Sequence, residues 1–522
     1  MLSEKAYSNA NRLMSQGKYI EALELASQIK SPALRAAVLI DAGYPLGKSS
    51  AVRNGIAAAM EALSPDSQAR QHFSPASLWY NLANGHYALF MLRRAHTARP
   101  LVSPNDGNAR SAKQAYRQAM AHLRNEPGTF KTQVWTNLGN CLSHFGRGME
   151  AIDCYREALR EEPANGMAAG NLGVELLHAA DITGRYRHDY MLAARVHLVA
   201  ALGPTMHLRY GGQDAVRGFV DALSKVEEFF SMHKREVRPT RPAAPPSRRK
   251  STLQYIRFCQ EHSLFLSAWA GDARDLPARS DEVSLGPIVT SLDDNSTVPE
   301  LLRILNEIKE SFATARYLAF LALSAQPQLS DASALTRYFQ LPALEALYGT
   351  PLGMLKSAYS QAFDVLDKVA RLVNVYFQIG VRTDSFWRVF ATRQSLGKTQ
   401  EIRWIARPAI AASYNFSLYA LADLAIDYYD AQLTDLPAID KRRNRMTHDY
   451  LLVLPRHADD SHDDAAIMLG DLIDGTLRTL RLAKYSVLYC VSAIYIAEAR
   501  KQRRGKTIPV VYRDTPGVAT PG

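Results

Sequence analysis

Apolar residues recur along most of this chain at the three- and four-residue spacing of an α-helix. Residues 1–203 consist of Ala- and Leu-rich segments separated by short polar breaks. Nothing in the chain has the strand alternation or the Gly-rich phosphate loop of a nucleotide-binding α/β domain. The pattern therefore predicts an all-α protein. In the second half it predicts helices over residues 299–325, 332–348, 351–380, 407–432, 436–454 and 465–503.

One segment of the first half has the signature of a tetratricopeptide repeat, which consists of two packed helices over about 34 residues. Small residues stand where the two helices would cross, aromatic and small residues where the next repeat would pack, and a proline where the second helix must end. The positions that agree are Trp135, Leu138, Gly139, Leu142, Ala151, Tyr155, Ala158 and Pro163.

Neighbouring segments carry parts of the same signature. Leu172 and Gly173 fall one period after Leu138 and Gly139, and residues 79–84 echo residues 135–140. The partner helix of 79–84 would be residues 112–123, with an insertion between, and residues 17–23 resemble the turn and second helix of another repeat. We expect three or four degenerate repeats in a curved array, which either binds a protein partner or serves as a structural arm.

A change of composition separates the two halves. Residues 233–250 are rich in Pro and Arg, which is typical of an extended linker whose basic side chains are solvated or touch RNA nonspecifically. The sequence thus predicts repeats over residues 1–205, a linker region over 206–295, a helical domain over 296–505 and a flexible tail over 506–522.

Composition and charge narrow the class of protein. The 522 residues include 47% hydrophobic and 22% charged side chains, and a net charge of +11 suits a polyanionic partner such as RNA. Four scattered cysteines without a CxxC pair argue against a zinc ribbon or a disulfide framework and are typical of buried thiols in a reducing cytosol. No secretory signal is visible, and the apolar segment 485–497 is too short to span a bilayer. We expect a cytoplasmic protein.

The candidate chemistry lies in the sequence Arg443-Asn444-x-x-x-His448. In the predicted helix, Asn444 and His448 are four residues apart and share a face, and Arg443 lies one step round. A guanidinium group binds phosphate through a planar fork, and an imidazole transfers protons near neutral pH. These groups can cleave RNA without a metal by using its 2′-hydroxyl as the nucleophile.

Spacing alone does not single out this segment. Similar Arg–His spacings occur at Arg117 and His122, Arg257 and His262, and Arg456 and His462. Among the four, the 443–448 segment has both a hydrogen-bonding Asn beside the arginine and a predicted helical setting, whereas Arg456 precedes an acidic loop. The structural alternative is a solvated basic helix end.

The order of three blocks carries a resemblance to a known family. Tyr255, Cys259 and residues 262–266 come first, residues 357–377 follow, and the Arg443-Asn444-x-x-x-His448 segment comes last. Over residues 251–500 the chain resembles the HEPN superfamily of small helical ribonuclease domains, and it looks most like the bacterial branch that is joined to tetratricopeptide repeats. This resemblance implies a site built from two motif helices, hence a homodimer, and a toxin or phage-defence effector.

The resulting prediction is a metal-independent endoribonuclease without a cofactor, with Arg443, Asn444 and His448 as catalytic residues. RNA is its expected substrate, and a protein partner is expected on the repeats. The alternatives are a repeat scaffold without catalysis and a module that binds RNA without cleaving it. A cation on the acidic loop 457–464 is less expected than a solvated loop, and Glu307 or Glu310 would assist His448 or stay exposed.

Overall fold

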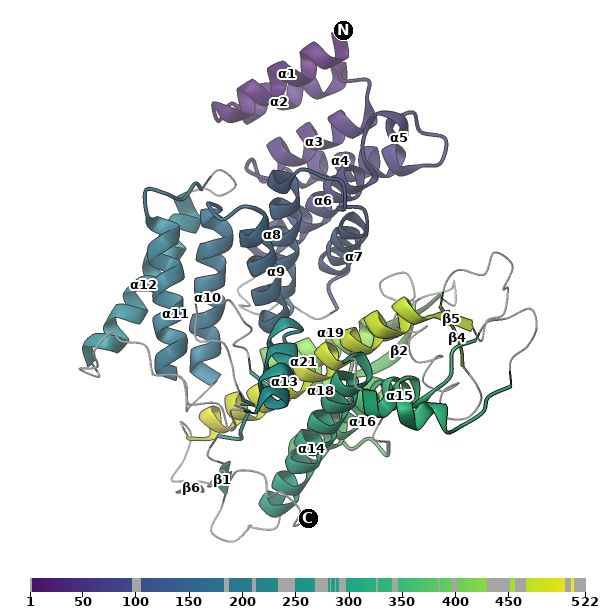
Figure 1. The fold of residues 1–522 in the computed structure, drawn as a ribbon. Coiled ribbons are helices and arrows are strands. Elements are labelled where there is room, and N and C mark those ends of the chain that lie inside the picture. The colour runs from purple at the N-terminus through teal and green to yellow at the C-terminus, as the bar shows by residue number, and fades with distance from the viewer. Residues whose placement is uncertain are drawn as a thin grey trace. The chain divides into compact units, whose positions relative to one another are not determined.

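The computed structural model describes residues 2–95, 105–182, 187–208, 213–232, 249–267, 280–281, 283–286, 288–290, 297–324, 327–339, 346–383, 385–396, 401–429, 451–455, 466–502 and 508–510. The chain forms two compact units. The first unit comprises Met1–His178 and Tyr190–Val237, and the second comprises Ala179–Asp189 and Arg238–Gly522. The described part of both units is mainly helical, as the sequence predicts, so the fold class is all-α (Figure 1).

Consecutive helices of the first unit pack against one another (Figure 1). The helices are α1 (Leu2–Ser15), α2 (Tyr19–Leu25), the 3-10 helix η1 (Ala26–Gln28), α3 (Pro32–Gly43), α4 (Ser49–Leu63), α5 (Ala69–His72), α6 (Pro75–Ala95), α7 (Gly107–Ala121), α8 (Gly128–His144), α9 (Gly148–Glu161), α10 (Gly166–Ile182), α11 (Arg187–Leu202) and α12 (Gln213–Met232).

Helices α8 and α9 coincide with the segment that has the repeat signature. Gly146, at φ 78°, makes the turn between them in a conformation that glycine adopts without strain. Gly139 lies against the buried ring of Tyr155, where an added Cβ would be 2.6 Å from Cε1. Gly173 of α10 lies equally close to Leu198 of α11. The small residues therefore stand where two helices cross, as the repeat prediction requires, although the repeat family itself remains a prediction.

A line of asparagine side chains links successive helix pairs of this unit. An asparagine in the first helix of a pair accepts one hydrogen bond from a tyrosine in the second helix and another from an asparagine in the next pair. The bonds are Tyr116 to Asn84 (2.7 Å), Asn137 to Asn84 (3.2 Å), Tyr155 to Asn140 (2.9 Å) and Asn171 to Asn140 (2.7 Å). Because residues 79–84 echo 135–140 in sequence, the same polar contact recurs at equivalent positions.

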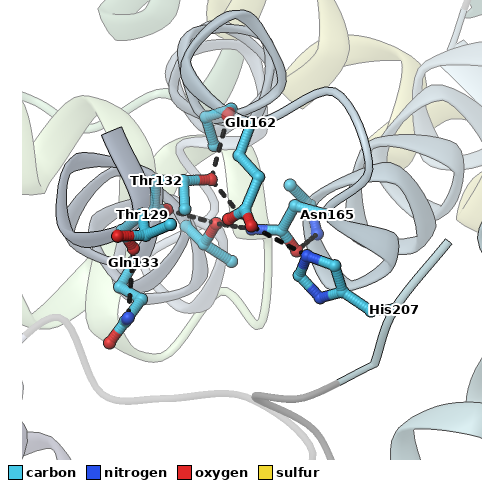
Figure 2. Close-up of polar contacts among 9 residues, drawn as sticks. Thr129, Thr132, Gln133, Glu162, Asn165 and His207 are labelled. Carbon is cyan, nitrogen blue, oxygen red and sulfur yellow. Dashed lines mark hydrogen bonds and ion pairs between the residues drawn. The ribbon is translucent and has the colours of Figure 1, made fainter. Parts of the chain in front are cut away.

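A second polar network ties the connection after α11 to the helices before it (Figure 2). The buried Asn165 side chain donates to Thr132 Oγ1 at 2.9 Å, and Thr132 Oγ1 donates to the Ala158 carbonyl at 2.9 Å. His207 Nε2 lies 2.8 Å from Glu162 Oε1, and the His207 carbonyl accepts from the Gly166 amide at 3.0 Å. These bonds satisfy buried polar groups where α9, α10 and the later segment meet.

The second unit contains eight described helices and six short strands. The helices are α13 (Lys250–Glu261), α14 (Thr297–Leu323), α15 (Pro327–Ala334), α16 (Thr350–Phe377), α17 (Phe386–Phe390), α18 (Pro408–Ala411), α19 (Phe416–Tyr429) and α21 (Leu469–Gln502). The strands are β1 (Ile288–Thr290), β2 (Ala391–Leu396), β3 (Glu401–Ala406), β4 (Leu452–Leu454), β5 (Ala466–Met468) and β6 (Ile508–Val510).

The core of this unit forms around the long helices. Helix α16 packs against both α14 and α21, and these three helices supply much of the buried apolar surface (Figure 1). The strands form three two-stranded sheets: antiparallel β1–β6 and β2–β3, and parallel β4–β5. Each sheet joins segments at the margin of the bundle.

Several predicted helices differ from the structure. The predicted helix over 332–348 is wrong, because α15 ends at Ala334 and the Leu347 amide instead donates to the Val453 carbonyl at 2.7 Å. The sequence places Pro342 inside that range, and proline interrupts a helix. The predicted 407–432 helix is broken at Tyr414, which has φ 52°. Ile508–Val510, within the predicted tail, pairs with β1.

The glycine at the helix crossing provides a test of this packing. Gly139→Ala should lower the free energy of unfolding of the first unit by about 1–2 kcal/mol, because the new methyl group displaces the buried Tyr155 ring. Gly218→Ala is the matched control, because a Cβ on this exposed glycine of α12 meets nothing within 4 Å. That variant should be stabilised by up to about 1 kcal/mol. Urea unfolding followed by circular dichroism measures both, and equal stability of the two variants would contradict the packing.

Candidate functional site

The predicted catalytic residues Arg443, Asn444 and His448 lie outside the described residues, as does most of the predicted 436–454 helix. The described chain ends before them at Tyr429 of α19 and resumes after them at Leu451. At its far end the predicted helix is wrong, since Leu452–Leu454 forms strand β4. The structure therefore defines the two segments that flank the motif.

The segment after the motif is held by polar contacts from two sides. Lys356 of α16 donates from Nζ to the carbonyl of the buried Leu451 at 2.8 Å. The carbonyl of Val453 accepts from the Leu347 amide at 2.7 Å. Strand β4 also pairs in parallel with β5, with Val453 opposite Ile467. Burial lowers the pKa of Lys356 from its ordinary value.

An apolar cluster closes around the same segment. Leu451 and Val453 are buried together with Leu355 of α16, Ile467 of β5 and Leu472 of α21. Partly buried residues of α14, α15–α16 and α21 complete the cluster, namely Ala322, Leu323, Leu347, Leu352, Leu469 and Ile473. The apolar run that follows the motif in sequence thus packs onto the helical core as an extended segment.

The segment before the motif is the buried helix α19. Asn415 caps its start, because Asn415 Oδ1 accepts from the amides of Ser417 at 3.1 Å and Leu418 at 3.3 Å. Asn415 Nδ2 also donates to the Ala493 carbonyl of α21 at 2.8 Å. Further along the helix, the carboxylates of Asp423 and Asp427 are fully buried, one turn apart. Such carboxylates are stable only with polar or charged partners.

A buried arginine joins the first sequence block of the resemblance to the helical core. Arg316 of α14 is 5% exposed, and its guanidinium group donates to Tyr255 Oη, to the Leu264 carbonyl and to both oxygens of Asp281, at 2.8–3.1 Å. It also lies 5.2 Å from the ring centroid of Phe265. Burial alone would lower the pKa of Arg316, but the carboxylate of Asp281 raises it.

Cys259 lies beside this arginine. The thiol is buried, and burial raises its pKa to about 11, so it stays protonated near neutral pH. Its environment is that of a core thiol rather than a nucleophile. All four cysteines are free and buried, as the sequence predicts.

Two of the other Arg–His spacings lie within the described chain. Arg257 is exposed on α13, and His262 packs edge-on against Phe258 at 4.7 Å between ring centroids. Burial lowers the pKa of His262. Arg117 lies in α7, and His122 caps the end of that helix. His462 and the acidic loop lie outside the described residues, and the residues that the structure does describe hold no cluster of three metal-ligating side chains.

Glu307 of α14 is engaged by a neighbouring helix. Lys368 of α16 lies 3.3 Å from Glu307 Oε2 and also donates to Ser311 Oγ at 2.6 Å. Arg371, one turn after Lys368 on α16, pairs with Glu300 of α14 at 3.9 Å. Glu307, proposed from sequence as an assistant to His448, therefore belongs to an ionic strip between α14 and α16.

Helix α21 is long and apolar enough to cross a membrane, by length and composition alone. The apolar segment 485–497, which by itself is too short to span a bilayer, is part of this longer helix, which extends without interruption over Leu469–Gln502. However, 78% of its most apolar 18-residue stretch is buried inside the unit, and a core helix can have the same length and apolar composition. One such helix does not define a membrane protein.

Comparison with known protein families supports the resemblance for the C-terminal part of the chain. Residues 292–497 match the LA2681-like HEPN family. This range begins just before α14, ends within α21 and includes the sequence Arg443-Asn444-x-x-x-His448. No curated protein matches the chain. Residues 292–497 are therefore similar to HEPN-type domains.

Sequence reasoning missed several residues that shape this domain. Lys356, Arg316 and Asp281 make contacts over long sequence separations, and no local pattern marks such partners. Asp423 and Asp427, in contrast, are marked by a local pattern in the sequence. They stand four residues apart within an apolar run, where a charged side chain is costly unless it has a structural or functional role.

Lys356 provides a test of how the segment after the motif is held. Lys356→Met keeps the apolar stem but leaves the Leu451 carbonyl without its donor, at a cost of about 1–3 kcal/mol. Amide hydrogen exchange at residues 451–454 should become faster. Lys368→Met is the matched control, because Lys368 lies on the same helix but is bound to α14 instead. It should leave exchange at 451–454 unchanged, and equal acceleration in both variants would contradict the specific contact.

Proposed function

We propose that the C-terminal domain is a metal-independent endoribonuclease. The observation that carries this proposal is the match of residues 292–497 to a HEPN family over a range that contains Arg443, Asn444 and His448. The contacts around Leu451 support it. His448 and Leu451 are three positions apart in sequence, so the chain from one to the other spans at most about 11 Å, and Leu451 is held by α16.

The chemistry follows from the RNA substrate. The 2′-hydroxyl loses its proton, its oxygen attacks the adjacent phosphorus, and the bond to the 5′-oxygen breaks as that oxygen gains a proton. His448 serves as the acid or base for these transfers. Arg443 stabilises the charge that grows on the non-bridging oxygens, and Asn444 holds a phosphate oxygen or orients the imidazole. The product is a 2′,3′-cyclic phosphate, so neither a metal nor a cofactor is required.

We propose further that the first unit regulates this activity. Its helix pairs share equivalent asparagine contacts, which supports the prediction of tetratricopeptide-like repeats and of a protein partner bound to them. Together with the HEPN family match, this arrangement favours a cytoplasmic toxin or phage-defence effector. The competing function is a scaffold that assembles proteins through the repeats without cleavage. A wild-type protein that does not cleave RNA would favour this scaffold function.

The catalytic proposal predicts a specific pattern of variants. His448→Ala should reduce cleavage of total RNA by about 10²–10⁴-fold, because it removes the proton-transfer group. Arg443→Lys should also be strongly impaired, since it keeps the charge but loses the planar fork. Arg117→Ala and Arg257→Ala are controls from the other spacings and should cleave normally. Cleavage should persist in excess EDTA. Products with a 5′-phosphate, or equal activity of wild type and His448→Ala, would overturn the mechanism.

The composite site predicts complementation between inactive chains. In a homodimer with one shared site, Arg443→Ala and His448→Ala chains should be inactive separately and should regain part of the activity when mixed. Each mixed dimer then contains one intact arginine from one chain and one intact histidine from the other. Sedimentation of the mixture verifies that dimers form. A monomer that is fully active would remove the argument for a shared site.

A further inference from the structure

The hairpin β2–β3 and its flanks carry basic charge that the domain does not balance locally. Residues 382–407 contain six basic and two acidic side chains, a formal charge of +4, compared with +11 for all 522 residues. The basic residues are Arg382, Arg388, Arg393, Lys398, Arg403 and Arg407, and the acidic ones are Asp384 and Glu401. More than a third of the net charge is therefore concentrated in one short segment.

The hairpin has a defined register and a fixed base. Ala391 pairs with Ala406 at the base, where both are buried, and Arg393 pairs with Trp404 one step further out on the same face. Arg407 strengthens the base, because its guanidinium group donates to the Arg388 carbonyl at 2.6 and 2.8 Å. The hairpin thus projects from a rigid attachment to the helical core.

Arg393 and Trp404 form a stacked pair on this face. The guanidinium carbon of Arg393 lies 5.0 Å from the centroid of the Trp404 ring. Arg393 is exposed and Trp404 is half-buried. Stacking fixes the plane of the guanidinium group and leaves its N–H edges available to phosphate oxygens.

These arginines differ from Lys368 and Arg371 of α16, which are paired with carboxylates. Within the described chain, the exposed Arg382, Arg388 and Arg393 have no carboxylate at ion-pair distance. By contrast, Lys368 and Arg371 line a cavity of about 590 Å³ between α14 and α16, together with the glutamates that they bind. Lys368 and Arg371 are thus neutralised by glutamates, whereas Arg382, Arg388 and Arg393 have no such partner among the described residues and are available to an anionic ligand.

We propose that the β2–β3 hairpin is a binding surface for single-stranded RNA, in which Arg393, held against the Trp404 ring, contacts phosphate and stacks its outer face with a base. Proteins that bind single strands combine a basic surface with aromatic side chains, because every base has a π-face and every nucleotide a phosphate. An acidic protein surface would use the free arginines but would not require the indole ring. The proposal rests on the proposed function for the choice of RNA, and none of its contacts involves the motif.

The experiment measures binding without cleavage. His448→Ala protein is titrated into a fluorescently labelled single-stranded RNA of mixed sequence, in EDTA, and anisotropy is recorded over a series of salt concentrations. Adding Trp404→Ala should weaken binding about tenfold through the loss of stacking. Adding Arg393→Ala should weaken binding and reduce the slope of log K against log salt by about 0.7, which corresponds to one lost phosphate contact.

Two further variants distinguish a specific role of the hairpin from a loss of positive charge elsewhere and from a folding defect. Arg371→Ala removes the same charge from α16 and should bind RNA as the His448→Ala parent does. Trp404→Phe keeps an aromatic face and should retain most of the affinity, which distinguishes stacking from a folding defect. Circular dichroism of each protein verifies its helix content.

The outcomes test the RNA-binding proposal and the catalytic proposal separately. Unchanged affinity in Arg393→Ala and Trp404→Ala, or an equal loss in Arg371→Ala, overturns the hairpin as the RNA surface even if the wild-type protein cleaves RNA. The expected losses in a protein whose wild type fails to cleave would support the hairpin and refute the catalytic proposal.

Discussion

The C-terminal unit depends on the burial of helix α16 along its length. This 28-residue helix places Leu355, Phe363 and Val373, among others, in the core against α14 and α21. Burial of each large apolar side chain stabilises the fold by about 1.5–3 kcal/mol. Because neighbours pack on two sides of α16, a shift of this helix would disturb both contacts at once. The segments at the margin of the bundle are positioned by a helix that cannot move independently of the core.

The polar side chains of α16 then fix those marginal segments. Lys356 holds the Leu451 carbonyl, which follows the motif, and Asp367 accepts from the Phe386 amide at 3.0 Å, at the start of α17. Lys368, on the next position, binds Glu307 and Ser311 of α14. One helix therefore positions both the chain that leaves the predicted catalytic motif and the chain that leads into the basic hairpin. Precise placement of reacting groups requires this kind of rigid support.

The sequence predicted the long helices well because their apolar stripes have the helical period over many turns. Helices α14, α16 and α21 begin and end within four residues of the predicted bounds. It failed where short segments depend on distant partners. The apolar sequence Leu452–Leu454 is compatible with either a helix or a strand. It forms a strand because it pairs with Ala466–Met468. The hairpin of Ala391–Leu396 with Glu401–Ala406 was also missed.

The candidate site shows the same division between local and distant information. Arg443, Asn444 and His448 are recognisable because their chemistry and order form a compact pattern. The lysine that holds Leu451 stands 95 residues away in sequence, so no local pattern could identify it. A buried carboxylate is an intermediate case. Asp423 and Asp427 lie on one face of an otherwise apolar helix, so their presence in the core was visible in the sequence, but their surroundings were not.

Under the two proposals, the distribution of charge separates RNA binding from catalysis in this domain. Arg371 and Lys368 are paired with glutamates on α14, which reduces the attraction of these two side chains to a polyanion. Arg393 of the hairpin and Arg382 and Arg388 before it, which have no carboxylate partner among the described residues, lie in a different segment, whose sequence contains none of the three motif residues. Phosphate attraction acts at every nucleotide of a strand, whereas proton transfer acts at one bond. A domain that holds the strand with one element and cleaves with another can change its affinity for RNA without altering the groups that react.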